Sequence, residues 1–146
     1  MKKLLLILLI CSSLFSKSIY TLDNVKNLHI YFANKSGFLD KQDKDKILQY
    51  IKNELTKAGF VLGKTDSSTF FLKVSAKEVD DTYIINVQSG LAEEVITRRK
   101  DNIETFAYTY FASELIESDE PKEDTVEVIE FLLNQFIVAY KDDNEE

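Results

Sequence analysis

The sequence is poor in the residues on which many small catalytic and metal sites depend. Its 146 residues include one cysteine, one histidine, one proline and no tryptophan. A single cysteine excludes an internal disulfide and two-cysteine redox motifs. The single histidine, His29, has no partner at a spacing that would build a zinc site or a catalytic triad around it. We therefore expect a protein that is not an enzyme and holds no metal or cofactor.

Turn-forming residues are also scarce, because the chain has only four glycines besides its one proline. This scarcity argues against a sandwich with many turns and favours a few long elements. Hydrophobic residues make up 45% of the chain, and ten Phe and seven Tyr supply large core side chains. The length predicts one domain with enough buried surface to fold without disulfides.

Residues 1–16 have the three parts of a secretory signal: two lysines, an apolar run over residues 4–10, and small serines at the end. The apolar run is shorter than the roughly 20 residues that span a bilayer. We expect cleavage near Ser16 or Ser18, followed by one domain over residues 19–141. The expected location is the periplasm.

Lipidation at Cys11 is the alternative processing, because Leu-Leu-Ile-Cys is similar to a bacterial lipobox. Ile10 stands where that motif takes a small residue. Lipidation would anchor the protein to a membrane, whereas cleavage after Ser16 would leave it without cysteine.

The charge balance is acidic, with 25 Asp and Glu against 18 Lys and Arg and a net charge of −7. Removing the leader takes away two lysines and no acid, which leaves 25 acidic against 16 basic residues. Such a surface repels phosphate backbones and anionic lipids. We expect no nucleic-acid partner.

The chain is organised around residues 70–96, two long runs of alternating polarity joined at Asp80-Asp81. Alternation predicts two strands with one buried face each. The two aspartates predict a turn, although without glycine not of the tightest kind. Ser89-Gly90 predicts a bulge or bend in the second strand.

The flanking segments complete an α+β pattern. Leu28, Ile30 and Phe32 alternate as in a strand, and a helix should begin at a capping Asp40 and end at Gly59. After a turn at residues 98–102, residues 103–116 match both helical spacing and strand composition, and we predict a strand at residues 105–113.

Apolar residues that recur three and four apart up to Tyr140 predict a second long helix. Pro121 suits the first turn of this helix. The acidic tail, residues 142–146, is predicted to be disordered. The expected order is β-α-β-β-β-α, a mostly antiparallel four-stranded sheet with both helices on one face.

Two stretches of the sequence resemble known groups of bacterial envelope and exported proteins. LHIYFANKSG, followed by a helix ending in Ala58-Gly59-Phe60, resembles the opening of small bacterial envelope domains: the amino-terminal domain of the Tol propeller protein, the curli secretion lipoprotein and the lipopolysaccharide-assembly lipoprotein. The second half, from YIINVQSGLAEEV through FAYTYFAS to FLLNQFIVAYKDDN, is similar to a family of uncharacterised exported proteobacterial proteins, with Tyr110 where that family has Trp. The resemblance implies the fold and another envelope protein as partner. It implies no catalytic residues.

Few acidic residues suggest chemistry. Glu93 falls on the apolar face of its strand, so burial or a basic partner such as Arg98 or Arg99 would make it a site candidate, and a hydrolase using it is a third, minor hypothesis. The stretch DKQDKD at residues 40–45 lacks the glycine and terminal glutamate of a calcium loop.

A surface is the better candidate. Alternation places Tyr31, Phe71 and Phe111 on the sheet face that the helices should leave uncovered, and Arg98 and Arg99 at a hairpin tip. A contiguous apolar patch there would mark a partner surface. The leading hypothesis is a non-catalytic envelope domain that binds a partner through a sheet edge or this face. The alternative is a small carrier of an apolar ligand held between sheet and helices.

Overall fold

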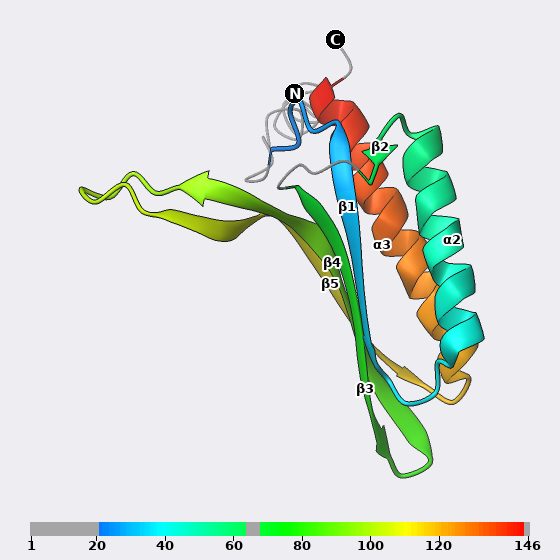
Figure 1. Ribbon diagram of the computed structural model, residues 1–146. Coiled ribbons are helices and arrows are strands. Elements are labelled where there is room, and N and C mark those ends of the chain that lie inside the picture. Colours follow the sequence, from blue (N-terminus) through cyan, green and yellow to red (C-terminus); the bar gives the residue numbers. More distant parts are fainter. Residues whose placement is uncertain (1–20, 64–67, 145–146) are drawn as a thin grey trace, which may run out of the picture.

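The computed structural model describes residues 21–63 and 68–144, which form a sheet with two helices packed on one of its faces (Figure 1). The elements, in chain order, are β1 (Asn27–Lys35), α2 (Lys41–Lys57), β2 (Val61–Leu62), β3 (Thr69–Val79), β4 (Thr82–Ile96), β5 (Glu104–Ser118) and α3 (Pro121–Asn144). The strands lie in the order β2-β1-β3-β4-β5. The predicted α+β class is confirmed.

The sheet has five strands, one more than expected, and its pairing is mixed although most paired residues are antiparallel, as expected. β1 runs parallel to both neighbours, β2 and β3, while β3, β4 and β5 are antiparallel. The parallel pairing of β1 with β3 follows from α2, which carries the chain back across the sheet between them. β2 has two residues, too few to produce a periodic pattern in the sequence.

The core lies between the sheet and the helices, and Phe136 of α3 is at its centre. The ring of Phe136 is fully buried, with its centroid 4.9 Å from Phe70, 5.3 Å from Tyr110 and 5.7 Å from Phe60. These rings come from β3, β5 and the segment after α2. The predicted apolar faces of both helices and of the strands therefore meet in one cluster.

The predicted boundaries of α2 are confirmed. Asp40 caps the helix by accepting a hydrogen bond from the Asp43 N–H at 2.9 Å, and the Asp43 carboxylate accepts in return from the Asp40 N–H at 3.1 Å. Gly59 ends the helical segment with φ of +100°, and Phe60 donates back to the Leu55 carbonyl. At the start of the helix, the reciprocal bonds of Asp40 and Asp43 satisfy two backbone donors that lack partners within the helix.

The Asp80-Asp81 turn is tighter than the sequence suggested. Val79 and Thr82 pair directly, so only these two residues form the loop. Their φ angles of 46° and 67° are those of the hairpin turn that usually takes Asn-Gly. Aspartate tolerates this left-handed conformation better than most residues, which explains how the turn forms without glycine.

The predicted strand at residues 105–113 is confirmed and is longer, because β5 continues to Ser118. The bulge predicted at Ser89-Gly90 lies elsewhere. Leu91 pairs with Tyr110 and Ala92 with Tyr108, so the extra residue is Thr109 on β5. Alternation along β4 alone does not show where the neighbouring strand carries an extra residue.

The tail predicted to be disordered from residue 142 is helical up to Asn144. The backbone N–H of Leu22 donates to the Asp143 carboxylate at 2.7 Å, and that of Asn24 donates to the Asn144 side-chain oxygen at 2.9 Å. The Asn144 amide donates to the Leu22 carbonyl at 2.9 Å. These bonds to a segment about 120 residues away hold the acidic end in place.

The predicted signal over residues 1–16, its cleavage site and Cys11 lie outside the described residues. Within the described ranges, neither helix combines the length and the apolar character that crossing a bilayer requires.

Candidate interaction surface

The sheet face opposite the helices carries a row of aligned residues, one from each of four strands. Tyr31 of β1 is paired with Phe71 of β3, Phe71 with Gly90 of β4, and Gly90 with Phe111 of β5. Paired residues point to the same face of a sheet. The register therefore brings together the three aromatic residues that the sequence placed on this face, and sets glycine between them.

Phe71 is only 3% exposed although no helix covers it. Its ring lies on Gly90 and is flanked by the rings of Tyr108, with centroids 4.7 Å apart, and Phe111, at 6.4 Å. The Lys73 ammonium lies 5.0 Å from the Phe71 centroid and donates to the Tyr108 hydroxyl at 3.2 Å. Together, these side chains form a small second cluster outside the main core, which we call the outer aromatic cluster (Phe71, Tyr108 and Phe111).

The apolar face continues from this cluster onto a projecting hairpin. β3 begins at Thr69, opposite Ala92, and beyond that point β4 and β5 pair only with each other among the described strands. Residues 93–107 therefore form a two-stranded ribbon, the arm, which extends away from the rest of the sheet (Figure 1). The sequence predicted long strands, but it did not indicate that β3 would stop short of the arm.

The arm exposes large apolar side chains on the same face as the outer aromatic cluster. Phe106 lies two residues before Tyr108 and is 65% exposed, and Ile96 is 64% exposed. At the other end of the row, Tyr31 is 52% exposed. Isolated exposed apolar residues are common, but a series along one sheet face is the pattern of a contact surface.

Arg98 and Arg99 lie at the tip of the arm, apart from the aromatic row. Both are exposed, and the tip is closed by hydrogen bonds from the Thr97 N–H to the Ile103 carbonyl and from the Asn102 N–H to the Arg99 carbonyl, each at 3.0 Å. The predicted turn at residues 98–102 is confirmed. The five residues proposed from the sequence therefore belong to two places, the row and the tip.

Glu93 is half-buried and accepts hydrogen bonds from the hydroxyls of Ser68, at 2.7 Å, and Thr109. The structure pairs it with these hydroxyls and not with Arg98 or Arg99. His29 is exposed on β1. In residues 21–63 and 68–144, no three His, Cys, Asp or Glu side chains come close enough to hold a metal ion.

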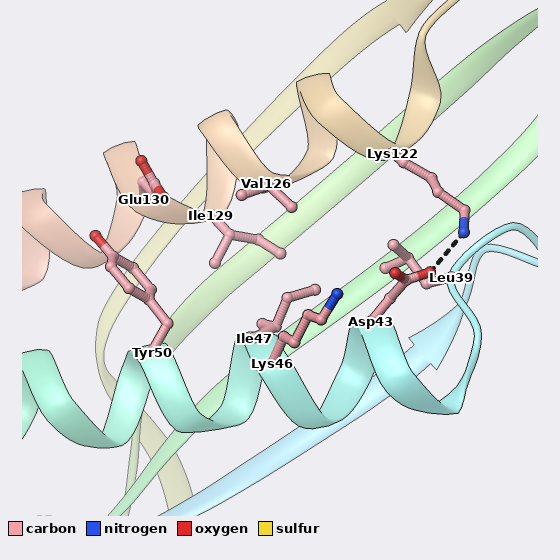
Figure 2. Close-up of a pocket in the computed structure, with 9 residues that line it drawn as sticks. All are labelled: Leu39, Asp43, Lys46, Ile47, Tyr50, Lys122, Val126, Ile129 and Glu130. Atoms are coloured by element: carbon pink, nitrogen blue, oxygen red, sulfur yellow. Dashed lines mark hydrogen bonds and ion pairs between the residues drawn. The ribbon is translucent and has the colours of Figure 1, made fainter.

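A second candidate site is a groove between α2 and α3, with a cavity volume of about 250 Å³ (Figure 2). Its apolar lining includes Ile47 of α2 and Val126 and Ile129 of α3. An ion pair between Lys122 and Asp43, at 2.7 Å, closes one end of the groove. Sequence reasoning missed this groove because neither helix alone indicates how the two pack.

Tyr50 and Glu130 face each other across this groove (Figure 2). Partial burial, and then the nearby Glu130 and Glu54 carboxylates, raise the pKa of the Tyr50 hydroxyl above its usual 10.0. At neutral pH the hydroxyl therefore stays protonated and can donate a hydrogen bond.

No protein-family model matches the sequence, and no curated protein matches it. Solved structures show a distant likeness, among them two bacterial lipoproteins. A minor lipoprotein from Acinetobacter baumannii is 12% identical, with a TM-score of 0.40 over 79% of this chain and 90% of that chain. Lipoprotein GNA1162 from Neisseria meningitidis is 11% identical, with a TM-score of 0.37 over 76% of this chain and 97% of that chain. At these values the likeness says nothing about a shared function.

Proposed function

We propose that this protein is a non-catalytic, exported domain of the cell envelope that binds another envelope protein through the uncovered face or an edge of its sheet. The observation that carries the proposal is a series of exposed apolar side chains on one sheet face. Tyr31 lies on one side of the buried Phe71 ring, and Tyr108, Phe106 and Ile96 follow on the other side and onto the arm. Exposed apolar patches of this kind mark interaction sites. Export is supported by the leader at residues 1–16.

The structural use of the acidic side chains supports a non-catalytic role. Asp40 and Asp43 cap α2, Asp124 accepts from the Ser118 hydroxyl at 2.5 Å, and Glu93 accepts from two hydroxyls. Each of these carboxylates completes a turn, a cap or a strand end. Asp124 also lines a groove with Glu114 and Glu127, but its carboxylate already accepts the hydrogen bond from Ser118.

Crosslinking in the producing cells tests the proposal. A photo-reactive residue is placed at Tyr31 or Phe106 on the uncovered face, and at Asn134 on the exposed side of α3 as the matched control. We expect Tyr31 and Phe106 to give adducts with the same protein, identified by mass spectrometry, and Asn134 to give none. Equal adducts from all three positions, or no adduct from the sheet face, would contradict the proposal.

A carrier of a small apolar ligand is the second candidate, and the groove of Figure 2 is the observation in its favour. Its cavity volume of about 250 Å³ lies below the range of roughly 300–1,000 Å³ that is usual for small-molecule sites. Only part of a lipid chain would fit. Organic-solvent extraction of the native protein that yields no lipid or quinone would contradict this function.

A further inference from the structure

The last strand, β5, forms the long open edge of the sheet within the described residues. At the opposite edge β2 has two residues, whereas β5 has fifteen. An edge strand leaves every second backbone N–H and C=O without a partner strand. β5 contains no lysine, arginine or proline, the residues that most often guard such an edge. After the bulge at Thr109, its residues up to Ser118 pair with β4 in regular register.

The two sides of this edge differ, the helix side being the more acidic. On the uncovered face, Phe111 is followed by Leu115, which is 69% exposed. On the helix side, a groove of about 490 Å³ separates β5 from α3. Carboxylates of Glu114, Asp124 and Glu127 line this groove, no basic residue lines it, and Phe131 is 49% exposed at its side.

The charges decide between a second copy of this chain and a different partner. A second copy would bring its own β5, with Glu104, Glu114 and Glu117 and no base, against the same residues. Like charges across paired strands are destabilising. An added strand with basic side chains on the helix side would instead meet opposite charges and satisfy the open backbone groups of β5.

We infer that the β5 edge accepts an extended segment of the partner protein in which lysine or arginine alternates with apolar residues. The basic side chains lie over the acidic groove beside α3, and the apolar side chains continue the row of Phe111 and Leu115 on the uncovered face. This inference rests on the proposed function and adds the mode of binding and the chemistry of the partner segment.

Synthetic peptides test the inference with the isolated native protein. The probe is a fluorescent ten-residue peptide of alternating valine and lysine. The controls are the same peptide with glutamate in place of lysine, and one with alternate backbone nitrogens methylated. We expect binding of the lysine peptide, and at least about tenfold weaker binding of both controls, because one lacks charge complementarity and the other lacks the backbone donors.

Variants of the protein locate the site. Glu114→Gln with Glu127→Gln should weaken the lysine peptide about fivefold, because both carboxylates border the edge. The matched control, Asp45→Asn with Asp142→Asn, removes the same charge elsewhere and should leave the affinity within about twofold. Amide hydrogen exchange should slow at alternate residues of β5 when the lysine peptide binds.

Equal affinity for the glutamate peptide, unchanged exchange in β5, or equal effects of the two double variants would overturn the inference. A dimer of the protein alone with slowed β5 exchange would overturn it too. If in-cell adducts form at Tyr31 and Phe106 while the peptides fail, the proposed function stands and the strand-addition mode is wrong. If the peptides bind at β5 while those adducts are missing, the edge is right and the proposed use of the uncovered face is wrong.

Discussion

The ring of Phe71 packs closely against Gly90, its partner on the neighbouring strand. A β-carbon built on Gly90 would lie 2.8 Å from both Cε1 and Cζ of this ring, and would also collide with the Tyr110 carbonyl oxygen. Gly90 is therefore required for close packing, not for a turn. An aromatic ring over a glycine on the adjacent strand shields backbone that would otherwise face water.

Gly90→Ala should destabilise the protein by about 1–3 kcal/mol, because the added methyl forces the Phe71 ring aside in a packed site. The free energy of unfolding in urea measures this. Phe71→Leu in the Gly90→Ala background should recover only part of the loss, since the Tyr110 carbonyl is backbone and cannot turn away. A Gly90→Ala variant as stable as the parent protein would show that the ring does not depend on glycine.

Alternation along single strands was enough to place most side chains on the correct face. Leu28 and Phe32 point into the core as their alternation predicted, and Tyr31 and Phe71 point away from the helices. Period two is a local property of a strand, so one strand's sequence contains it.

The alignment of the row and the length of the arm depend instead on register. Tyr31, Phe71 and Phe111 are aligned across the sheet only because three strand pairings bring them level, and one extra residue, Thr109, sets the position of Tyr108. The arm exists because β3 begins at Thr69. No single segment of the sequence contains these relationships.

The prediction that the acidic tail is disordered failed for a similar reason. Composition treats Asp143 and Asn144 as like-charged or polar residues at a chain end, which favours disorder. Their side chains pair with the backbone of Leu22 and Asn24, far away in sequence. A long-range hydrogen bond leaves no periodic or compositional signal.

Phe106→Ser and Phe71→Ser should have opposite consequences for stability and binding. Phe106 is 65% exposed, so its loss should change the unfolding free energy by no more than about 0.5 kcal/mol while reducing the in-cell adducts formed from Tyr31. Phe71 is buried in the outer aromatic cluster, and its loss should cost about 3 kcal/mol or more. Urea unfolding and crosslinking yields measure the two effects. Unchanged adducts in the Phe106→Ser variant would exclude the arm from the contact surface.

Asp81→Gly should stabilise the hairpin between β3 and β4. Asp81 has φ of 67°, a left-handed conformation that costs a non-glycine residue roughly 1 kcal/mol and that glycine adopts freely. We expect a gain of up to about 1 kcal/mol in the unfolding free energy, reduced by the greater freedom of glycine in the unfolded chain. The matched control is Asp45→Gly in helix α2, which should be destabilising by about 0.5 kcal/mol or less because aspartate is itself a weak helix former. A loss of stability in Asp81→Gly would mean that the aspartate side chain itself holds the turn.

The ion pair between Lys122 and Asp43 should make stability depend on pH at both ends of the range. The hydrogen bond from Lys122, and then that from the Asp40 N–H, hold the pKa of the Asp43 carboxyl below its usual 3.8. Because this pKa is lowered by folding, the stabilisation that the charged Asp43 carboxylate gives the folded state is present above about pH 4. It is lost as the pH falls through the folded-state pKa. The bond to Asp43 likewise raises the pKa of Lys122 above 10.5, so its contribution is lost as the pH rises through that raised value.

Lys122→Gln removes the pair with Asp43, and with it the longer contact of 3.8 Å to Asp40, while both backbone hydrogen bonds of the α2 cap remain. It should raise the pKa of Asp43 toward 3.8, though not fully, because the Asp40 N–H still donates. Carboxyl NMR titration measures this shift, and urea unfolding at about pH 7 and about pH 2 should show the stability difference from the parent protein only at the higher pH. Lys57→Gln is the control, since Lys57 pairs with Glu54 at 2.6 Å within α2 and should leave the Asp43 titration unchanged. An Asp43 pKa that does not rise in Lys122→Gln would show that the helix cap alone, and not the contact between α2 and α3, keeps this carboxylate charged.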